Sequence, residues 1–386
     1  MTNRDGTLDV VRGITIALML VVNNPGSWAN IYPILAHAKW DGFTFADFVF
    51  PSFLFWVGFS CILSISKASS SQNPTSLELL RVFRRSLILI FLGLFLNCIP
   101  DWNFANLRFP GVLQRIGVVY FLNYILFRFL PKQYPFLLFL LVSIAYEYSY
   151  FSIAPPDYLL QVPWTPSPEF HLGAYFDRMI FQKHLWTFTK VWDPEGLFST
   201  FSSLGNSILG AYFAIWVLER AKSSSHSKGD ISQKSGTVII TRGFLIQVCS
   251  GLGLVVIATV LSNWIPINKS VWSISFTLFS SGICILLYSG IHVVMTTNRI
   301  SELSTLLFSP FGRNSILAFV LSGLFSKFLA FTKIGVMTTK GFLYTNLFLH
   351  PTLPKEFSSF LFSLAYLLLF YVLFLFLYRK KRFLAI

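Results

Sequence analysis

Long runs of apolar residues recur from one end of the chain to the other. Each run has about the length, roughly 20 helical residues, that crosses an apolar slab about 30 Å thick. The runs stay apolar on every side, whereas strands of a membrane barrel alternate apolar and polar positions over about ten residues. The pattern therefore predicts an all-α bundle of about ten transmembrane helices, at residues 9–27, 43–66, 84–100, 111–130, 134–153, 197–219, 243–264, 270–293, 304–330 and 356–378.

The connections between these runs are short, and we find no room in them for a separate soluble domain. The longest are 154–196, 220–242 and 331–355. We therefore predict a single transmembrane domain over residues 1–386, in which the polar stretch 220–242 joins two halves. The stretch 154–196 interleaves prolines with tryptophans, which is typical of an ordered loop at a membrane interface.

Composition agrees with a membrane chain, because 54% of the residues are hydrophobic and only 12% are charged. An ordinary soluble domain has roughly a quarter charged residues. The net charge of +14 does not indicate a nucleic-acid partner, since the basic residues concentrate at the termini and in alternate connections. This distribution predicts that both termini are cytoplasmic, with membrane lipids as the partner of the basic residues.

The four cysteines lie inside apolar runs without CxxC spacing, so neither a metal site nor a disulfide framework is expected.

Polar residues that interrupt the apolar pattern concentrate between Asp9 and Asp47. An ionisable group near or within the membrane is costly and is therefore a functional candidate. Asp9 and Arg12 are three residues apart and can neutralise one another on one helix face. Asn23 and Asn24 end the first apolar run, where they are either turn residues or amides that contact a substrate.

His37 follows the first apolar run, on the outer side according to the charge pattern. An imidazole titrates near neutral pH and can take a proton from an incoming amine or hydroxyl. Asp47 can orient this ring and stabilise its cation. Spacing alone leaves two other interpretations open, namely a structural histidine at the interface and a carboxylate that only caps or packs against a helix.

Ordered motifs connect the chain with a known family. Three of them are LDVVRGITIA at 8–17, VNNPG at 22–26 and LAHAKWDGFTFADFVFP at 35–51. Shorter ones are RRSL at 84–87, PGVLQRIG at 110–117, DPEGL at 193–197, NKSVW at 268–272 and GRNSI at 312–316. Together they resemble the heparan-alpha-glucosaminide N-acetyltransferase family and its bacterial relatives over nearly the whole chain.

This resemblance implies an enzyme in a bacterial cytoplasmic membrane that takes acetyl groups from cytosolic acetyl-CoA. The acceptor implied is the amine of an amino sugar or related glycan on the outer side. The family's catalytic histidine maps onto His37, and an upstream asparagine maps onto Asn23, with Asn24 as the alternative. His37 would act as the base and Asn23 would donate to the oxyanion, while transient acetylation of the imidazole stays open.

Two further groups of candidates follow from the chemistry of the substrates. The guanidinium group of arginine can donate two hydrogen bonds to a phosphate of CoA, and the candidates for this contact are Arg12, Arg81, Arg84 and Arg85. The alternative role of these arginines is to orient the chain in the membrane. Contacts with the acceptor are expected on the outer side, and the candidates are Asn24, Gln114, Arg115, Asp193 and Glu195. The alternative role of these residues is to form a turn or to begin or cap a helix.

Two other functions remain open. One is an O-acyltransferase of cell-envelope glycans, since some membrane acyltransferases have a similar LDxxRG opening. The other is a transporter of a sugar or a lipid-linked intermediate, with Asp9, Arg12 and Asp47 as a buried polar path. Oligomeric state is not carried over from the family, and a homodimer stays open.

Overall fold

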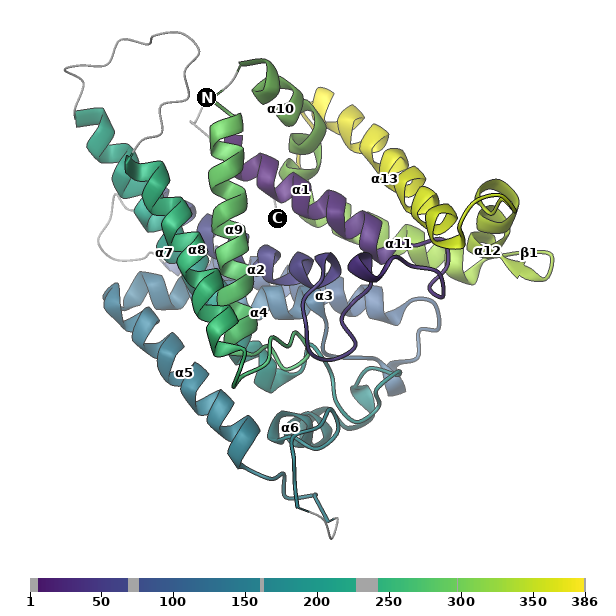
Figure 1. Ribbon diagram of the computed structural model, residues 1–386, viewed down its shortest axis with the longest axis horizontal. Coiled ribbons are helices and arrows are strands. Elements are labelled where there is room, and N and C mark those ends of the chain that lie inside the picture. Colours follow the sequence, from purple (N-terminus) through teal and green to yellow (C-terminus); the bar gives the residue numbers. More distant parts are fainter. Residues whose placement is uncertain (1–5, 69–75, 160–162, 227–241, 297, 385–386) are drawn as a thin grey trace. The chain divides into compact units, whose positions relative to one another are not determined.

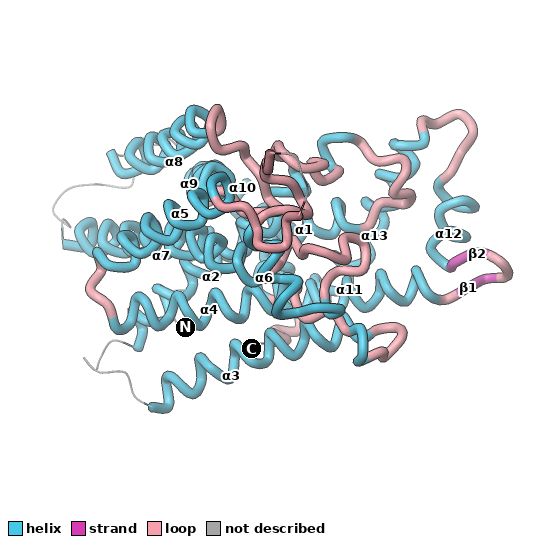
Figure 2. The backbone as a smooth tube through the Cα atoms, turned by 90° about the horizontal axis from the view of Figure 1, so that it is seen from below, coloured by secondary structure: helices cyan, strands magenta, loops and turns pink. Residues whose placement is uncertain are grey.

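The computed structural model describes residues 6–68, 76–159, 163–226, 242–296 and 298–384. Almost all of its regular secondary structure is helical (Figure 2), which confirms the prediction of an all-α chain. Its internal contacts divide the chain into two compact units, and each is described by itself below. The single domain expected from the sequence stays a prediction, and most of the polar stretch 220–242 lies outside the described residues.

Unit 1 comprises Met1–Lys39, Phe43–Val49 and Leu286–Ile386. Figure 1 shows α1 alongside α10 and α13, and these helices also contact one another. The helical elements and strands of unit 1 are α1 (Gly6–Asn23), η1 (Pro33–Leu35), α10 (Asn298–Arg313), α11 (Ser315–Phe331), β1 (Lys333–Ile334), β2 (Met337–Thr338), α12 (Thr339–Leu343), the π-helical turn η4 (Tyr344–Phe348) and α13 (Lys355–Arg379). The antiparallel pair β1–β2 forms a small hairpin after α11.

Unit 2 comprises Trp40–Gly42 and Phe50–Ile285. In it α3 packs on α4, and α7 packs on α4, α5 and α6. Its elements are α3 (Ser76–Cys98), η2 (Phe104–Asn106), α4 (Val112–Phe129), α5 (Gln133–Ser152), α6 (Leu172–Phe181), η3 (Gln182–His184), α7 (Leu197–His226) and α8 (Arg242–Leu261). Two helices continue from one unit into the other, α2 (Phe45–Ala68) and α9 (Ile274–Val294).

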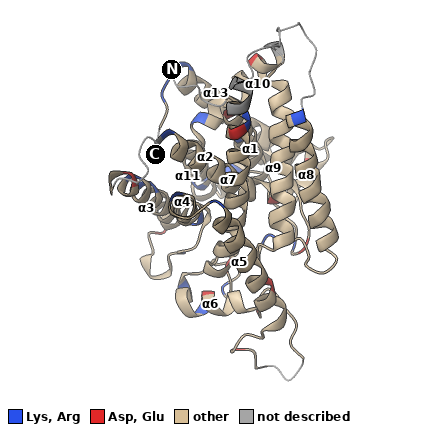
Figure 3. Cartoon of the chain, turned by 90° about the vertical axis from the view of Figure 1, so that its left-hand side faces the viewer, with Lys and Arg blue, Asp and Glu red and all other residues tan. Residues whose placement is uncertain are grey.

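Eight of the described helices are long and apolar enough to cross a membrane. Most of the ribbon carries neither sign of charge (Figure 3), and the chain is an integral membrane protein. The stretch expected as one span at 304–330 is instead two helices, α10 and α11, bent by 72°. The side chain of Asn314 lies at this break, where it donates to the Arg382 carbonyl at 3.2 Å and accepts from the Leu384 amide at 2.9 Å.

Glycines let helices of the same unit approach until their backbones touch. In unit 1, a Cβ added to Gly13 of α1 would lie 1.9 Å from the Phe308 carbonyl oxygen of α10. One added to Gly312 of α10 would lie 1.8 Å from the Asp9 carbonyl oxygen. In unit 2, Gly58 of α2 meets the backbone of α7 in the same way. Small residues serve this purpose in membrane helices because lipid tails provide no hydrophobic force that drives helices together.

These contacts predict that Gly13→Ala and Gly58→Ala each lower the thermal unfolding temperature of the purified protein in detergent. Overpacking of this kind costs about 1–3 kcal/mol. Gly290→Ala in α9 is the matched control, because nothing lies within 4 Å of a Cβ added there. Alanine otherwise favours a helix over glycine by roughly 0.5–1 kcal/mol, so the control should be neutral or more stable. Equal unfolding temperatures for all three variants would contradict the close contacts.

Candidate functional site

In unit 1, the carboxylate of Asp47 holds His37. Asp47 is 1% exposed and lies in the first turn of α2. Its Oδ1 lies 2.8 Å from His37 Nδ1, and its Oδ2 accepts from the Ala38 amide at 3.0 Å. An anion beside Nδ1 favours the proton on that nitrogen, so the neutral ring has its lone pair on Nε2. The imidazole itself is 48% exposed, and a proton can therefore reach it.

The same carboxylate also organises the start of α2. Asp47 Oδ2 accepts from the amide of Thr44 at 3.2 Å and from its hydroxyl at 3.0 Å, and the Asp47 amide donates back to the Thr44 hydroxyl at 3.4 Å. This reciprocal arrangement is a capping box with aspartate at its third helical position. Asp47 thus has the capping role and the histidine-orienting role at once, which the sequence had left as alternatives.

The two asparagines at the end of α1 differ in their surroundings. Asn24 is buried; its side-chain amide donates to the Leu20 carbonyl at 2.9 Å, and its backbone carbonyl accepts from the Ser363 hydroxyl at 3.1 Å. Asn23 is exposed, and the structure gives its side chain no hydrogen bond among the described residues. Asn24 is therefore part of the contact between α1 and α13, whereas the amide of Asn23 is accessible.

The candidates that the charge pattern assigned to the cytoplasmic side fall in both units. In unit 1, Asp9 Oδ2 accepts from Arg313 Nε at 3.1 Å. Arg313 is an ion-pair partner that helical spacing within α1 could not predict, and Arg12 is half-buried. In unit 2, the arginines predicted to contact CoA are all exposed on α3, at Arg81, Arg84 and Arg85.

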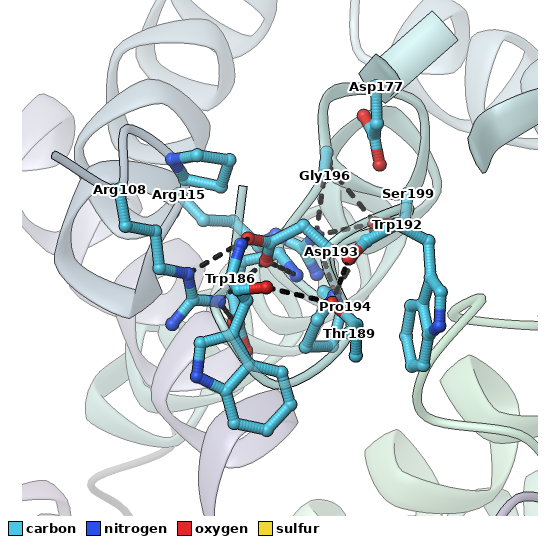
Figure 4. Close-up of polar contacts among 12 residues, drawn as sticks. Arg108, Arg115, Asp177, Trp186, Thr189, Trp192, Asp193, Pro194, Gly196 and Ser199 are labelled. Carbon is cyan, nitrogen blue, oxygen red and sulfur yellow. Dashed lines mark hydrogen bonds and ion pairs between the residues drawn. The ribbon is translucent and has the colours of Figure 1, made fainter. Parts of the chain in front are cut away.

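Unit 2 contains a buried cluster of arginines and carboxylates (Figure 4). Arg108, in the loop before α4, donates to both oxygens of Asp193, at 2.8 and 2.5 Å, and also pairs with Glu195. Burial alone would lower the pKa of Arg108, but the two carboxylates outweigh it and raise that pKa above its ordinary value. Motif and charge reasoning missed Arg108, because nothing in the sequence placed it opposite residues 193–195.

Arg115 lies in the first turn of α4 and is 2% exposed. Its Nη2 donates to the carbonyls of Pro194 and Gly196 at 3.0 and 3.1 Å, and to the Ser199 hydroxyl at 2.5 Å. The guanidinium also lies over the ring of Trp272, 5.0 Å from its centroid. Arg115 therefore holds the turn that leads into α7. The roles in acceptor binding predicted for Arg115, Asp193 and Glu195 stay predictions.

Gln114, the neighbouring candidate, is buried against glycines rather than set in an open site. A Cβ added to Gly93 of α3 would lie 2.1 Å from its Oε1, and one added to Gly111 would lie 2.6 Å from it. Its Nε2 is buried, without a hydrogen-bond partner among the described residues. Its predicted contact with an acceptor stays a prediction.

α6 contains Asp177, which borders the cluster, and the helix begins after a second titratable residue, His171. Asp177 accepts from the Leu197 amide at 2.9 Å and so caps α7, the role that had been considered for Asp193 and Glu195. Burial raises the pKa of Asp177 to about 7. His171 caps α6, where its Nδ1 accepts from the Ala174 amide at 3.2 Å. Burial, and then the charge of Arg178, lower the pKa of His171 to about 4.

These pKa shifts predict opposite pH dependences. The raised pKa of Asp177 stabilises the fold at pH values below the pKa that this carboxyl has in the unfolded chain, and the stabilisation is lost as pH rises through about 7. The lowered pKa of His171 stabilises the fold above about pH 6.5, and that stabilisation is lost as pH falls towards 4. Asp177→Asn should therefore gain thermal stability over the parent as pH rises from 4.5 to 8. His171→Gln should gain over the parent as pH falls from 7 to 4.5. Differences in unfolding temperature that do not vary with pH would contradict both assignments.

The two units together define a class of protein: a multihelical integral membrane protein in which a buried carboxylate orients an accessible histidine. Among the described residues, no group of three or more His, Cys, Asp or Glu side chains is placed to hold a metal ion. Residues 4–216 match the family model described as heparan-alpha-glucosaminide N-acetyltransferase, catalytic. The chain belongs to this family, as its motifs had indicated.

Two curated relatives have the same name. The heparan-alpha-glucosaminide N-acetyltransferase of Mus musculus is 30% identical over 376 residues, which cover 82% of this chain and 53% of the mouse protein. That of Homo sapiens is 28% identical over 387 residues, which cover 84% of this chain and 53% of the human protein. The chain thus spans about half the length of the curated relatives it matches.

Proposed function

We propose that this protein is a membrane N-acetyltransferase that transfers an acetyl group from cytosolic acetyl-CoA to the amine of an amino sugar on the outer side of the membrane. Family membership supports acetyl transfer to an amine. The observation that supports particular catalytic residues is the 2.8 Å contact between His37 Nδ1 and the buried carboxylate of Asp47. That contact orients an accessible imidazole in the tautomer that can accept a proton on Nε2.

The proposed reaction transfers one proton from the amine and releases one leaving group, the CoA thiolate. The amine nitrogen forms a bond to the thioester carbonyl carbon, and His37 Nε2 takes the proton that this nitrogen loses. The carbon–sulfur bond then breaks, and the CoA thiolate leaves and is protonated by the imidazolium or by water. The ionised carboxylate of Asp47 stabilises the imidazolium between these steps.

Asn23 is the proposed donor to the oxyanion of the tetrahedral intermediate. Its amide is exposed, whereas the amide of Asn24 already donates to the Leu20 carbonyl. A preorganised donor contributes most where negative charge develops on the carbonyl oxygen during the reaction. Asn24 is then better suited to fix the end of α1 than to contact substrate.

The proposed topology has about ten spans and both termini in the cytoplasm. The charge pattern supports this orientation, and the bent pair α10–α11 together with α3 would complete ten spans beside the eight long apolar helices. His37 then faces outward. The proposed CoA contacts are Arg12, Arg81, Arg84 and Arg85, and further acceptor contacts are proposed at Gln114, Arg115, Asp193 and Glu195.

The proposal predicts that His37→Ala lowers the rate of glucosamine acetylation about 100-fold or more, since a positioned general base contributes roughly 10²–10⁴-fold. Asp47→Asn should lower kcat less, because the imidazole remains but loses its anion. Purified protein in liposomes, with labelled acetyl-CoA and glucosamine, gives both rates. His350→Ala is the matched control, because His350 is exposed and pairs with Thr352; it should keep full activity.

Full activity of His37→Ala would overturn the proposed mechanism. Unfolding temperatures measured on the same samples separate loss of catalysis from loss of the α2 cap. Replacing glucosamine with glucose in the same assay tests hydroxyl acceptors, so acetylation of both sugars at equal rates would favour an O-acyltransferase. Movement of sugar across the liposome without consumption of acetyl-CoA would favour a transporter.

Direct transfer and transfer through an acetylated imidazole make different predictions in the absence of acceptor. Nε2 of a neutral imidazole is itself a nucleophile, so a two-step route should leave labelled acetyl on wild-type protein and none on His37→Ala. Direct transfer should leave label on neither. Rapid quenching followed by peptide mass spectrometry measures this label, and its appearance on both proteins would exclude His37 as the acetylated group.

A further inference from the structure

Unit 2 contains a cavity of about 240 Å³ that none of the predicted site residues lines. Its walls come from the segment after His37 in the sequence, the last turns of α5, and the turn before α9. An isolated bridge between Asp41 and Asn268 joins two of these walls, and the Gly42 amide donates to the Ile267 carbonyl at 2.7 Å. The cavity is therefore supported by backbone pairing between segments that are far apart in the sequence.

Two carboxylates line this cavity, and neither has a basic ion-pair partner among the described residues. Glu147 is 7% exposed, and one of its oxygens accepts from the Ile274 amide at 2.6 Å, at the start of α9. The structure gives its other oxygen no hydrogen bond among the described residues. Asp41 is exposed, and within the described part of the chain its side chain accepts from the Asn268 amide, at 3.0 Å. The buried charge of Glu147 is costly unless it meets an opposite charge. The exposed carboxylate of Asp41 adds to the negative charge that lines the cavity.

Three aromatic side chains also line the cavity. Trp40, Tyr150 and Phe151 all face the cavity. Trp40 is held by an edge-to-face contact with Trp192, at 5.4 Å and 90°. Aromatic faces attract cations and pack against apolar surface. Carboxylates beside aromatic rings therefore suit a ligand that combines an ammonium group with an apolar ring face.

We infer that this cavity binds the protonated amine and the ring of an amino-sugar acceptor, with Glu147 and Asp41 pairing to the ammonium group. The ammonium group gives up one proton to water before its nitrogen attacks the thioester, and the second proton goes to His37 Nε2 as the amide bond forms. A sulfated or phosphorylated group would meet like charge there, and a neutral sugar would leave the carboxylates uncompensated. The inference rests on the proposed function and adds to it an acceptor subsite that the motifs did not assign. Trp40 and Asp41 follow His37 by only three and four residues in the sequence.

The test is binding of methyl glucosaminide to the intact protein in detergent, measured by calorimetry against methyl glucoside and methyl N-acetylglucosaminide. Glu147→Gln and Asp41→Asn remove the charges but keep oxygens that can accept from the Ile274 and Asn268 groups. Each should weaken binding of the amine about tenfold or more, leave binding of the neutral sugars unchanged, and raise KM for the amine without changing KM for acetyl-CoA. Asp101→Asn, in an exposed loop of the same unit, should bind like wild type.

A second measurement needs no variant. Carbodiimide activation of wild-type protein in the presence of glucosamine joins a carboxyl carbon to the sugar amine as an amide, and the carbodiimide takes up the oxygen as a urea. Peptide mass spectrometry should find the adduct on the buried Glu147, and adducts only on exposed carboxylates such as Asp41 and Asp101 would overturn the inference. Unchanged amine affinity in Glu147→Gln and Asp41→Asn would also overturn it.

The same experiments separate this inference from the proposed function. Charge-dependent binding of the amine without acetylation would leave the subsite intact and refute the transferase. Acetylation whose KM for the amine is the same in all variants would leave the transferase intact and refute the subsite.

Discussion

A charged side chain that lies away from water needs an opposite charge or several hydrogen bonds, and this constraint organises both units of the protein. In unit 1 it is met by the bonds that Asp47 accepts from His37, Ala38 and Thr44. In unit 2 it is met by the pairing of Arg108 with Asp193 and Glu195. Each arrangement fixes a helix start and a loop together, so the polar groups that carry chemistry are also the ones that hold the backbone in place.

Asp47 shows how one residue can have a structural and a chemical role. Its carboxylate completes a capping box with Thr44 at the start of α2, and the same group orients the imidazole. Loss of the carboxylate would disturb both. The position of the imidazole is thus fixed to a helix terminus rather than left to a mobile loop, which is the kind of support that a precisely oriented base requires.

Glu147 is an exception to the pairing of buried charge, as Asp177 is in the described residues. It is nearly as buried as Asp47, yet the bond that it accepts comes from a backbone amide, and it lines a cavity with aromatic walls. Apolar surroundings disfavour the charged form of a carboxyl group, and a cation beside the group favours that form. The amine of the proposed acceptor would supply that cation, which links the cost of burying the charge to recognition of substrate.

The sequence by itself determined that the chain is helical and lies in a membrane, because long apolar segments in lipid must satisfy their backbone hydrogen bonds within a helix. The ordered motifs around His37 were also sufficient to place the chain in its family. What only the tertiary structure decided is which polar groups meet. Asp9 pairs with Arg313, Asp193 with Arg108, and Glu147 faces a cavity beside Asp41. Each of these relations joins residues far apart along the chain, and the apolar pattern, which records only how each helix meets lipid, contains no information about them.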